Sequence, residues 1–117
     1  MTPTSPIIAL ADLPRGRTSA ELIGADHGGL PLSIIVIEGA PPGTTVRRHR
    51  HDYPEIFLVQ AGEATFRLGD DTLVVRAGEI VIAPAGVPHG FTATGDDPLR
   101  QIDIHASPRF VTEYLEN

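Results

Sequence analysis

The chain has 117 residues, 41% of them hydrophobic, which is enough for one domain with one core. Its net charge is −6 and all nine cations are arginines, which argues against a nucleic-acid binder because such proteins carry a basic surface. Cysteine is absent, and this excludes disulfides, thiolate metal ligands and a cysteine nucleophile.

No segment predicts a membrane span or a secretory signal. The longest apolar run, residues 32–37, contains Ser33 and is much shorter than the about 20 residues that a transmembrane helix needs. The N-terminus lacks a basic region followed by a long apolar stretch. We therefore expect a cytoplasmic protein with no membrane partner.

Residues 1–17 are predicted to form an N-terminal arm, because Pro3, Pro6 and Pro14 interrupt any regular element. The arm is either loose or crosses to a partner subunit. Residues 7–10 are apolar and suited to extending a neighbour's sheet, and a small sandwich has edge strands to cover, so we expect a homodimer through sheet edges. Residues 18–117 form the single domain.

Short β-branched segments follow, bounded by Gly, Pro and Asp. Such segments, with turn signals between them, predict an antiparallel sandwich or barrel. The predicted strands are residues 18–23, 32–38, 44–51, 55–60, 63–68, 72–76, 79–83, 88–93 and 98–105. Gly69-Asp70-Asp71 is typical of a hairpin turn, and residues 84–88 must be a turn because two prolines cannot occupy a central strand.

A short helix is predicted at the C-terminus. Ser107 would cap it and Pro108 would occupy its first position. The residues on one face of this helix would be Phe110, Val111, Tyr114 and Leu115. We expect the helix to pack on the barrel.

Two stretches carry side chains of the kind that bind metals. His49 and His51 are two residues apart and therefore share a face of a strand, and Glu55 opens the next strand. His89 follows the turn at residues 84–88, so the fold must bring it to the others. Three imidazoles and one carboxylate suit a divalent first-row metal with positions left open for water or substrate. The alternative is that these are surface histidines in a turn-rich protein.

Both stretches resemble the two motifs of the cupins. Residues 43–62 match G-X5-H-X-H-X3-4-E-X6-G at every fixed position. Residues 78–93 match G-X5-P-X-G-X2-H-X3-N except at the end, where Ala93 replaces Asn. The resemblance implies an all-β jelly-roll barrel, a double-stranded β-helix, with one divalent metal inside it. The implied ligands are His49, His51, Glu55 and His89.

Segments outside the motifs resemble a widespread group of small single-domain cupins without an assigned activity. These segments are His27-Gly28, Ile104 to Phe110 and Glu113 to Glu116. The resemblance implies the fold and the site, and it leaves the reaction open.

Because residues two apart in a strand share a face, the same argument also selects candidate pocket residues. Arg47 would share the face of His49, Phe57 that of Glu55, and Phe91 that of His89. Arg47 would either hold a substrate carboxylate or lie solvated at the rim. With Gln101 on a later strand, these residues are the candidates for substrate binding.

Candidate catalytic residues lie close to the predicted ligands. Gln101, Asp103 and His105 alternate with Ile102 and Ile104, so one face of that strand is polar. The polar face turns either to solvent or to the cavity, and we expect it to face the cavity with at least one residue beside the metal ligands. The candidates are Asp103, His105 and Tyr53, of which Tyr53 would either cover the site or serve only in packing.

Two classes of function are compatible with such a site. The first is an enzyme acting on a small organic molecule with Fe, Mn, Ni, Co or Zn, where a dioxygenase leads and Lewis-acid isomerase, cyclase or lyase chemistry follows. The second is a non-catalytic module that binds or senses a metabolite or metal, which the lack of a helix-turn-helix disfavours. A storage-like structural role is disfavoured by the length of the chain.

Overall fold

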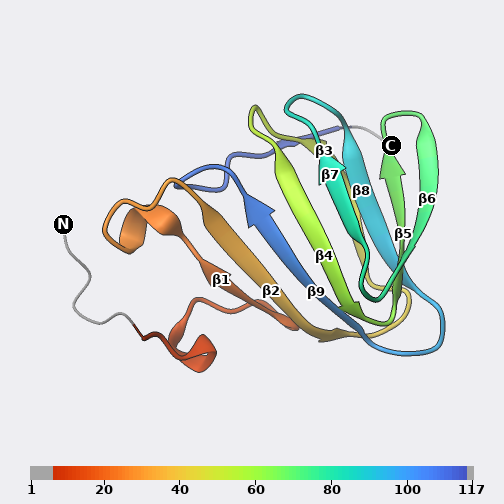
Figure 1. Ribbon diagram of the computed structural model, residues 1–117, viewed down its shortest axis with the longest axis horizontal. Coiled ribbons are helices and arrows are strands. Elements are labelled where there is room, and N and C mark those ends of the chain that lie inside the picture. The colour runs from red at the N-terminus through yellow and green to blue at the C-terminus, as the bar shows by residue number, and fades with distance from the viewer. Residues whose placement is uncertain (1–6, 116–117) are drawn as a thin grey trace.

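The computed structural model describes residues 7–115, and these form two five-stranded antiparallel sheets. Figure 1 shows the strands of the first sheet, which run in the order β1-β2-β9-β4-β7, lying across the front of the molecule. These strands are β1 (Ser19–Leu22), β2 (Ser33–Ala40), β9 (Leu99–His105), β4 (Glu55–Ala61) and β7 (Ile80–Ala83). The fold thus brings β9, late in the chain, between two earlier strands.

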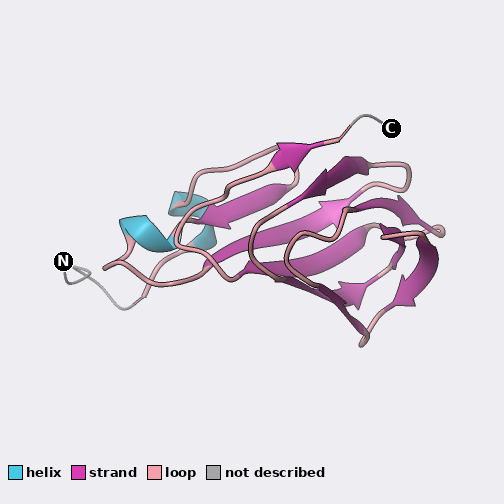
Figure 2. Ribbon diagram, turned by 90° about the horizontal axis from the view of Figure 1, so that it is seen from above, coloured by secondary structure: helices cyan, strands magenta, loops and turns pink. Residues whose placement is uncertain are grey.

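The second sheet faces the first, as Figure 2 shows from above. Its strand order is β10-β3-β8-β5-β6. Its strands are β10 (Glu113–Tyr114), β3 (Thr45–Arg50), β8 (His89–Thr94), β5 (Glu63–Leu68) and β6 (Asp71–Arg76). Two single-turn 3₁₀ helices, η1 (Leu10–Asp12) and η2 (Gly24–Asp26), complete the described elements. Within residues 7–115 no helix is long and apolar enough to cross a membrane.

All nine strands predicted from the sequence are present, with ends that differ by at most two residues. Strand β4 shows why the pattern was readable: Glu55, Phe57 and Val59 are buried while Ile56 is exposed. This period of two is the side-chain alternation of a strand with one face in a core.

The core lies between the sheets and is organised by three aromatic rings. The ring of Phe57 on β4 lies 4.9 Å from that of Phe66 on β5, and Phe66 stacks on Phe91 of β8 at 5.0 Å. All three residues are at most 5% exposed. The rings therefore join both sheets directly below the polar end of the barrel.

The predicted C-terminal helix is wrong. The amide of Arg109 does donate to Oγ of Ser107, at 3.3 Å, but no helix follows within the described residues. Glu113 and Tyr114 instead pair with Arg50 and His49 on β3. A helix this short is costly to nucleate, whereas the open edge of β3 offers unpaired backbone groups to any neighbouring extended segment.

The predicted arm is attached to the chain's own barrel through Leu13 and Arg15, residues 7–12 are exposed, and residues 1–6 fall outside the described part of the chain. Leu13 is buried, and Arg15 pairs with Ala20 through a backbone bridge. The guanidinium of Arg15 also lies 2.6 Å from the carboxylate of Glu38. These contacts attach the described part of the arm next to β1.

Candidate metal centre

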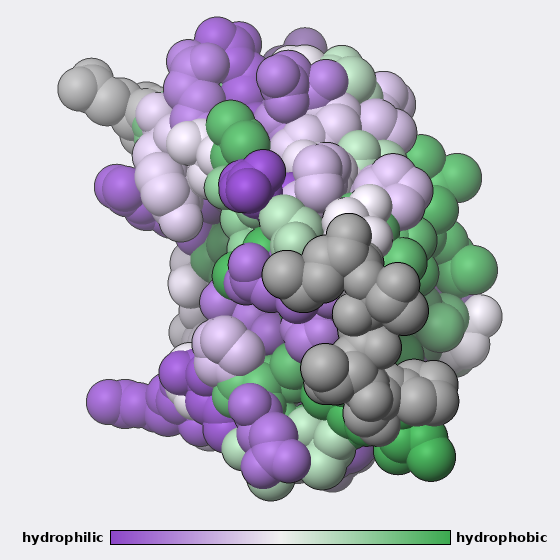
Figure 3. All heavy atoms as spheres, turned by 90° about the vertical axis from the view of Figure 1, so that its left-hand side faces the viewer, coloured by the Kyte–Doolittle hydropathy of each residue, from purple (hydrophilic) through white to green (hydrophobic). Residues whose placement is uncertain are grey.

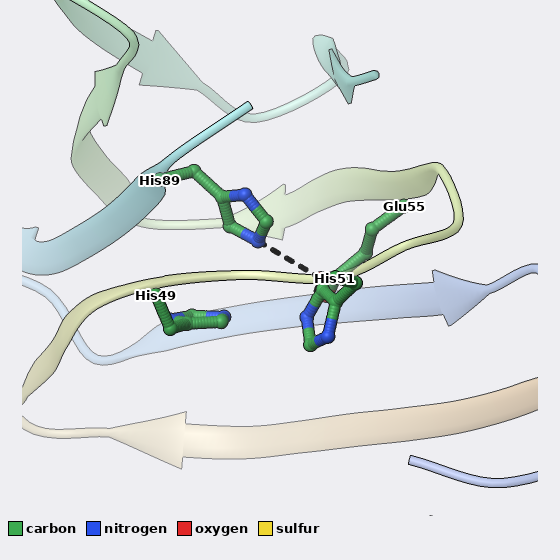
Figure 4. Close-up of side chains that lie close together, drawn as sticks. All are labelled: His49, His51, Glu55 and His89. Atoms are coloured by element: carbon green, nitrogen blue, oxygen red, sulfur yellow. Dashed lines mark hydrogen bonds and ion pairs between the residues drawn. The ribbon is translucent and has the colours of Figure 1, made fainter. Parts of the chain in front are cut away.

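The four predicted ligands converge at one end of the barrel. His49, His51, Glu55 and His89 are buried, and their candidate ligand atoms all lie within 4.8 Å of one another. Figure 4 shows His89 reaching from its own strand toward Glu55 and the two histidines of the first motif. The sequence prediction that these four residues form a cluster able to hold a metal is confirmed.

The glycines of the two motifs lie in turns at both ends of the barrel: Gly86 lies beside the cluster, where its amide donates to the carbonyl of His51 at 2.7 Å, whereas Gly43, Gly62 and Gly78 lie at the opposite ends of their neighbouring strands. Gly43, Gly62, Gly78 and Gly86 all have positive φ angles, between 80° and 96°. Residues that carry a side chain rarely adopt a positive φ angle, so these four positions favour glycine. The two motifs therefore contain both the candidate ligands and the glycine turns that bound the neighbouring strands.

A bulge in β3 changes which residues face inward. The pairing of β3 with β8 shifts register between Val46 and His49. As a result Val46 lines the cavity, while Arg47 is exposed with its guanidinium carbon 4.1 Å from the centre of the Tyr114 ring. The prediction that Arg47 shares the face of His49 is wrong, because alternation fails across a bulge. Arg47 is not among the residues that line the cavity.

Each ligand histidine is held by a hydrogen bond from Nδ1 to a backbone carbonyl. The acceptors are Arg47 for His49 (2.7 Å), Val111 for His51 (2.8 Å) and Val87 for His89 (2.9 Å). A carbonyl only accepts, so Nδ1 carries the proton in every ring. Each neutral ring then presents a bare lone pair at Nε2, as a metal ligand must.

These lone pairs face a negative carboxylate. Oε1 of Glu55 lies 3.0 Å from Nε2 of His51 and 3.2 Å from Nε2 of His89. Within the described residues, Nε2 of His51 is buried without an aligned hydrogen-bond partner. Acceptors packed against one another in a buried site repel unless a cation lies among them. The donor set therefore fits a divalent metal ion, and protons occupy the site in its absence.

The pKa values of the cluster follow from this arrangement. Burial acts to raise the pKa of Glu55, but contacts with His105, His51 and His89 outweigh burial and lower the pKa below its usual range. Burial lowers the pKa of His49. Burial acts in the same direction on His51, yet Glu55 and the carbonyl of Val111 outweigh it and raise the pKa of that imidazole. Glu55 is therefore ionised, and His51 holds a proton more readily than His49 does.

Two of the predicted catalytic candidates lie behind the ligands. Nε2 of His105 is 2.9 Å from Oε2 of Glu55, on the side of the carboxylate away from Oε1. The hydroxyl of Tyr53 lies 2.8 Å from Nδ1 of His105, and its ring stacks on His51 with centroids 4.7 Å apart. The prediction that β9 turns its polar face inward, with at least one residue beside the ligands, is confirmed. Ile102 and Ile104 lie on the opposite face and are only half-buried.

A cavity of about 370 Å³ extends from the ligands into the barrel. Phe57, Phe91 and Asp103 line it, as predicted, whereas Gln101 is buried beside Asp103 and is not among the lining residues. The amide Nε2 of Gln101 donates to Oδ1 of Asp103 at 2.8 Å. Burial and the charge of Glu55 raise the pKa of Asp103 well above its usual range, against the opposite effect of Gln101. The raised pKa favours the protonated, neutral form of Asp103, and this carboxyl faces the cavity.

Sequence reasoning missed several lining residues. Ile35 and Ile37 come from β2, and their alternation was a usable signal. Phe110, Thr112 and Tyr114 come from the C-terminal segment, which was predicted as a helix and so gave no signal. The exposed lining residues, which mark the mouth of the cavity, are Arg17, Thr44, Thr112 and Tyr114.

Comparison with known proteins gives a consistent family and fold. A family model described as "Cupin domain" matches residues 36–105. H2HPP isomerase of Bacillus subtilis is 38% identical over 71 residues, which cover 60% of this chain and 30% of that protein. Protein SchB of Streptomyces halstedii is 30% identical over 107 residues, covering 87% of this chain and 77% of that protein.

Solved structures share the architecture. An uncharacterised protein with a double-stranded β-helix domain from Klebsiella pneumoniae superposes with a TM-score of 0.75 at 21% identity. The match covers 97% of this chain and 99% of the other. At this identity the likeness supports the fold alone.

Proposed function

Because the chain belongs to the cupin family and its ligand set opens into a cavity, we propose that it is a metal-dependent enzyme acting on a small organic molecule. The observation that carries this proposal is the set of buried lone pairs facing Glu55, which requires a cation. A purely structural metal site would be closed, whereas this one borders an empty space of about 370 Å³. That volume is typical of pockets for small molecules.

The cavity walls indicate the kind of substrate. Most lining side chains beyond the ligands are apolar, among them Phe57, Phe91 and Leu99. Besides Glu55, the acidic residues that line the cavity in the described part of the chain are the half-buried Glu21 and the buried Asp103. We infer a compact substrate with an apolar body and oxygen atoms at the end that meets the metal.

We propose that the reaction is an isomerisation by proton transfer. A divalent ion held by the four ligands would supply Lewis acidity toward a substrate carbonyl. In this proposal the protonated carboxyl of Asp103, which lines the cavity, donates its proton to one carbon of the substrate. The resulting carboxylate then takes a proton from another carbon, which regenerates the acid without any oxidant. The name of the relative H2HPP isomerase supports isomerisation as the reaction.

The test uses zinc-loaded protein and a panel of small carbonyl compounds in D₂O. Proton NMR would follow deuterium entry at carbon, which isomerisation by proton transfer requires. We expect Asp103→Asn to bind zinc as the wild type does and to slow exchange by about 10²–10⁴-fold. The same rate in this variant would contradict the assigned role of Asp103.

Two other outcomes would select the alternatives. Oxygen consumption by the iron-loaded protein with a member of the panel would favour the dioxygenase that the ligand set predicts. Thermal stabilisation by a compound without turnover would favour a binding or sensing module.

A further inference from the structure

The C-terminal segment, residues 106–115, lies over the metal centre rather than apart from it. It joins the edge of β3 through two residue pairs, Glu113 with Arg50 and Tyr114 with His49. The amide of Leu115 donates to the carbonyl of Arg48 at 3.1 Å. None of the four predicted ligands belongs to this segment.

One residue of the segment, Val111, makes two backbone hydrogen bonds into the site. Its carbonyl accepts from Nδ1 of His51 at 2.8 Å, and its amide donates to the hydroxyl of Tyr53 at 3.2 Å. Val111 as a residue is 55% exposed, and the two hydrogen bonds that reach the site come from its backbone. Val111 thus fixes the tautomer and orientation of one ligand directly.

A second ligand is reached through two side chains. The oxygen of Tyr53 accepts the Val111 amide, and its hydroxyl is placed to donate to Nδ1 of His105 at 2.8 Å. With Nδ1 as acceptor, His105 carries its proton on Nε2, which lies 2.9 Å from Oε2 of Glu55 as an ion-pair contact, without the alignment of a hydrogen bond. Each of these side chains is at most 8% exposed, so water does not substitute for a lost partner.

We propose that the C-terminal segment is a coupled part of the metal centre, in which Val111 positions His51 directly and Glu55 through Tyr53 and His105. Docking of the segment then strengthens metal binding, and by reciprocity metal binding strengthens docking. This inference rests on the proposed metal site. Tyr53 and His105 are positioning residues, since they act on the metal through Glu55.

Tyr53→Phe tests the coupling with little change in shape, because the ring that stacks on His51 remains. We expect zinc affinity, measured by competition with a fluorescent chelator, to fall by about 10–100-fold, as is typical when outer partners of metal ligands are removed. Tyr114→Phe is the matched control. It also removes a phenolic hydroxyl from the mouth region, but no hydrogen bond of that hydroxyl occurs among the described residues, so we expect unchanged zinc affinity.

Amide hydrogen exchange measures whether zinc stabilises the docked segment. If Tyr53 had only a structural role, replacing it would not change this effect of zinc. In the wild type, zinc should slow amide exchange in residues 106–115, and in Tyr53→Phe this zinc-dependent protection should be reduced or lost. His105→Gln, whose amide N–H can still approach Glu55, should retain more zinc affinity than His105→Leu. Circular dichroism would show that each variant is folded before these values are compared.

The possible outcomes distinguish a failure of the coupling from a failure of the proposed metal site on which it rests. If the wild type binds zinc and Tyr53→Phe binds it equally tightly, the coupling is overturned while the metal site stands. Protection of residues 106–115 that does not depend on zinc would overturn it as well. A wild type that binds no divalent metal would overturn both proposals.

Discussion

Glu55 keeps a negative charge in the interior because three imidazoles surround it. Its lowered pKa means that the carboxylate is present at any ordinary pH. The histidines balance that charge either as cations or as ligands of a cation. A proton and a metal ion therefore compete for the same lone pairs.

Metal affinity should consequently rise with pH. Protonated His51 cannot bind metal, and its raised pKa extends this competition above the ordinary histidine range. As pH rises through that pKa the proton is lost and binding strengthens. Zinc competition titrations from pH 5.5 to 8 would measure the effect. Near the lower end of this pH range, zinc binding should release protons from the protein. An affinity that does not vary over this range would contradict the raised pKa of His51.

Asp103 should make the stability of the fold depend on pH. The sign of this dependence should be opposite to the one that a salt-bridged carboxylate produces. Its folded-state pKa is raised, so the folded protein binds more protons than the unfolded chain between the two pKa values. The free energy of unfolding should therefore fall with rising pH across that window, by up to about 1.4 kcal/mol per pH unit. In Asp103→Asn, urea denaturation should no longer show this fall in the free energy of unfolding with rising pH. A variant whose pH profile matches the wild type would contradict the buried, neutral assignment.

Individual side chains were predictable wherever strand alternation holds. His49, His51, Asp103 and His105 all face inward as the period of two requires. Arg47 does not, because the bulge between Val46 and His49 is set by the approach of another strand and leaves no mark in the local sequence.

At the scale of elements, β3 and β8 approach unusually closely beside the metal centre. A Cβ added to Gly90 would lie 2.8 Å from the carbonyl oxygen of Val46 and 3.2 Å from the backbone of Arg47. Glycine at this position lets the bulged part of β3 pack on β8, and the bulge in turn places His49.

Gly90→Ala should therefore weaken both the fold and the metal site. We expect a loss of about 1–3 kcal/mol in the free energy of unfolding, as for other overpacked positions, together with weaker zinc binding. Chemical denaturation and chelator competition would measure the two effects. Gly78→Ala is the control, because a Cβ there meets open space and only the positive φ is penalised. Equal zinc affinity in both variants would contradict the role of the close approach.

The C-terminal segment shows where element prediction from sequence fails. Ser107 and Pro108 form a valid local helix signal, and the cap bond itself is present. The outcome is decided by the open edge of β3 and by the bonds of Val111 to His51 and Tyr53, all distant in sequence. Such contacts are set by the tertiary fold.

At the scale of the whole molecule, the outer face of the first sheet is apolar. Ile56, Ile80 and Ile82 are between 39% and 60% exposed. Cross-strand pairing places Ile104 beside Ile56 and Ile102 beside Leu58 on the same face. Figure 3, a view from the side of β1, shows a hydrophobic band along the edge that belongs to this sheet. Apolar patches of this kind mark interaction sites.

We therefore predict a homodimer, now through this face as well as through the sheet edges that the sequence suggested. Light scattering at micromolar concentration should give twice the 12.5 kDa of one chain. Ile82→Glu should shift the protein toward the monomer, because it would bury a charge in the contact. A wild-type mass of one chain would contradict the prediction.

The most direct test of the central claim is an anomalous difference map from crystals of the zinc-loaded protein, recorded above the zinc absorption edge. The account predicts one strong peak among His49, His51, Glu55 and His89, about 2.0–2.2 Å from each ligand atom. Zinc-loaded crystals without a peak at this position, or with their only peak elsewhere, would contradict it.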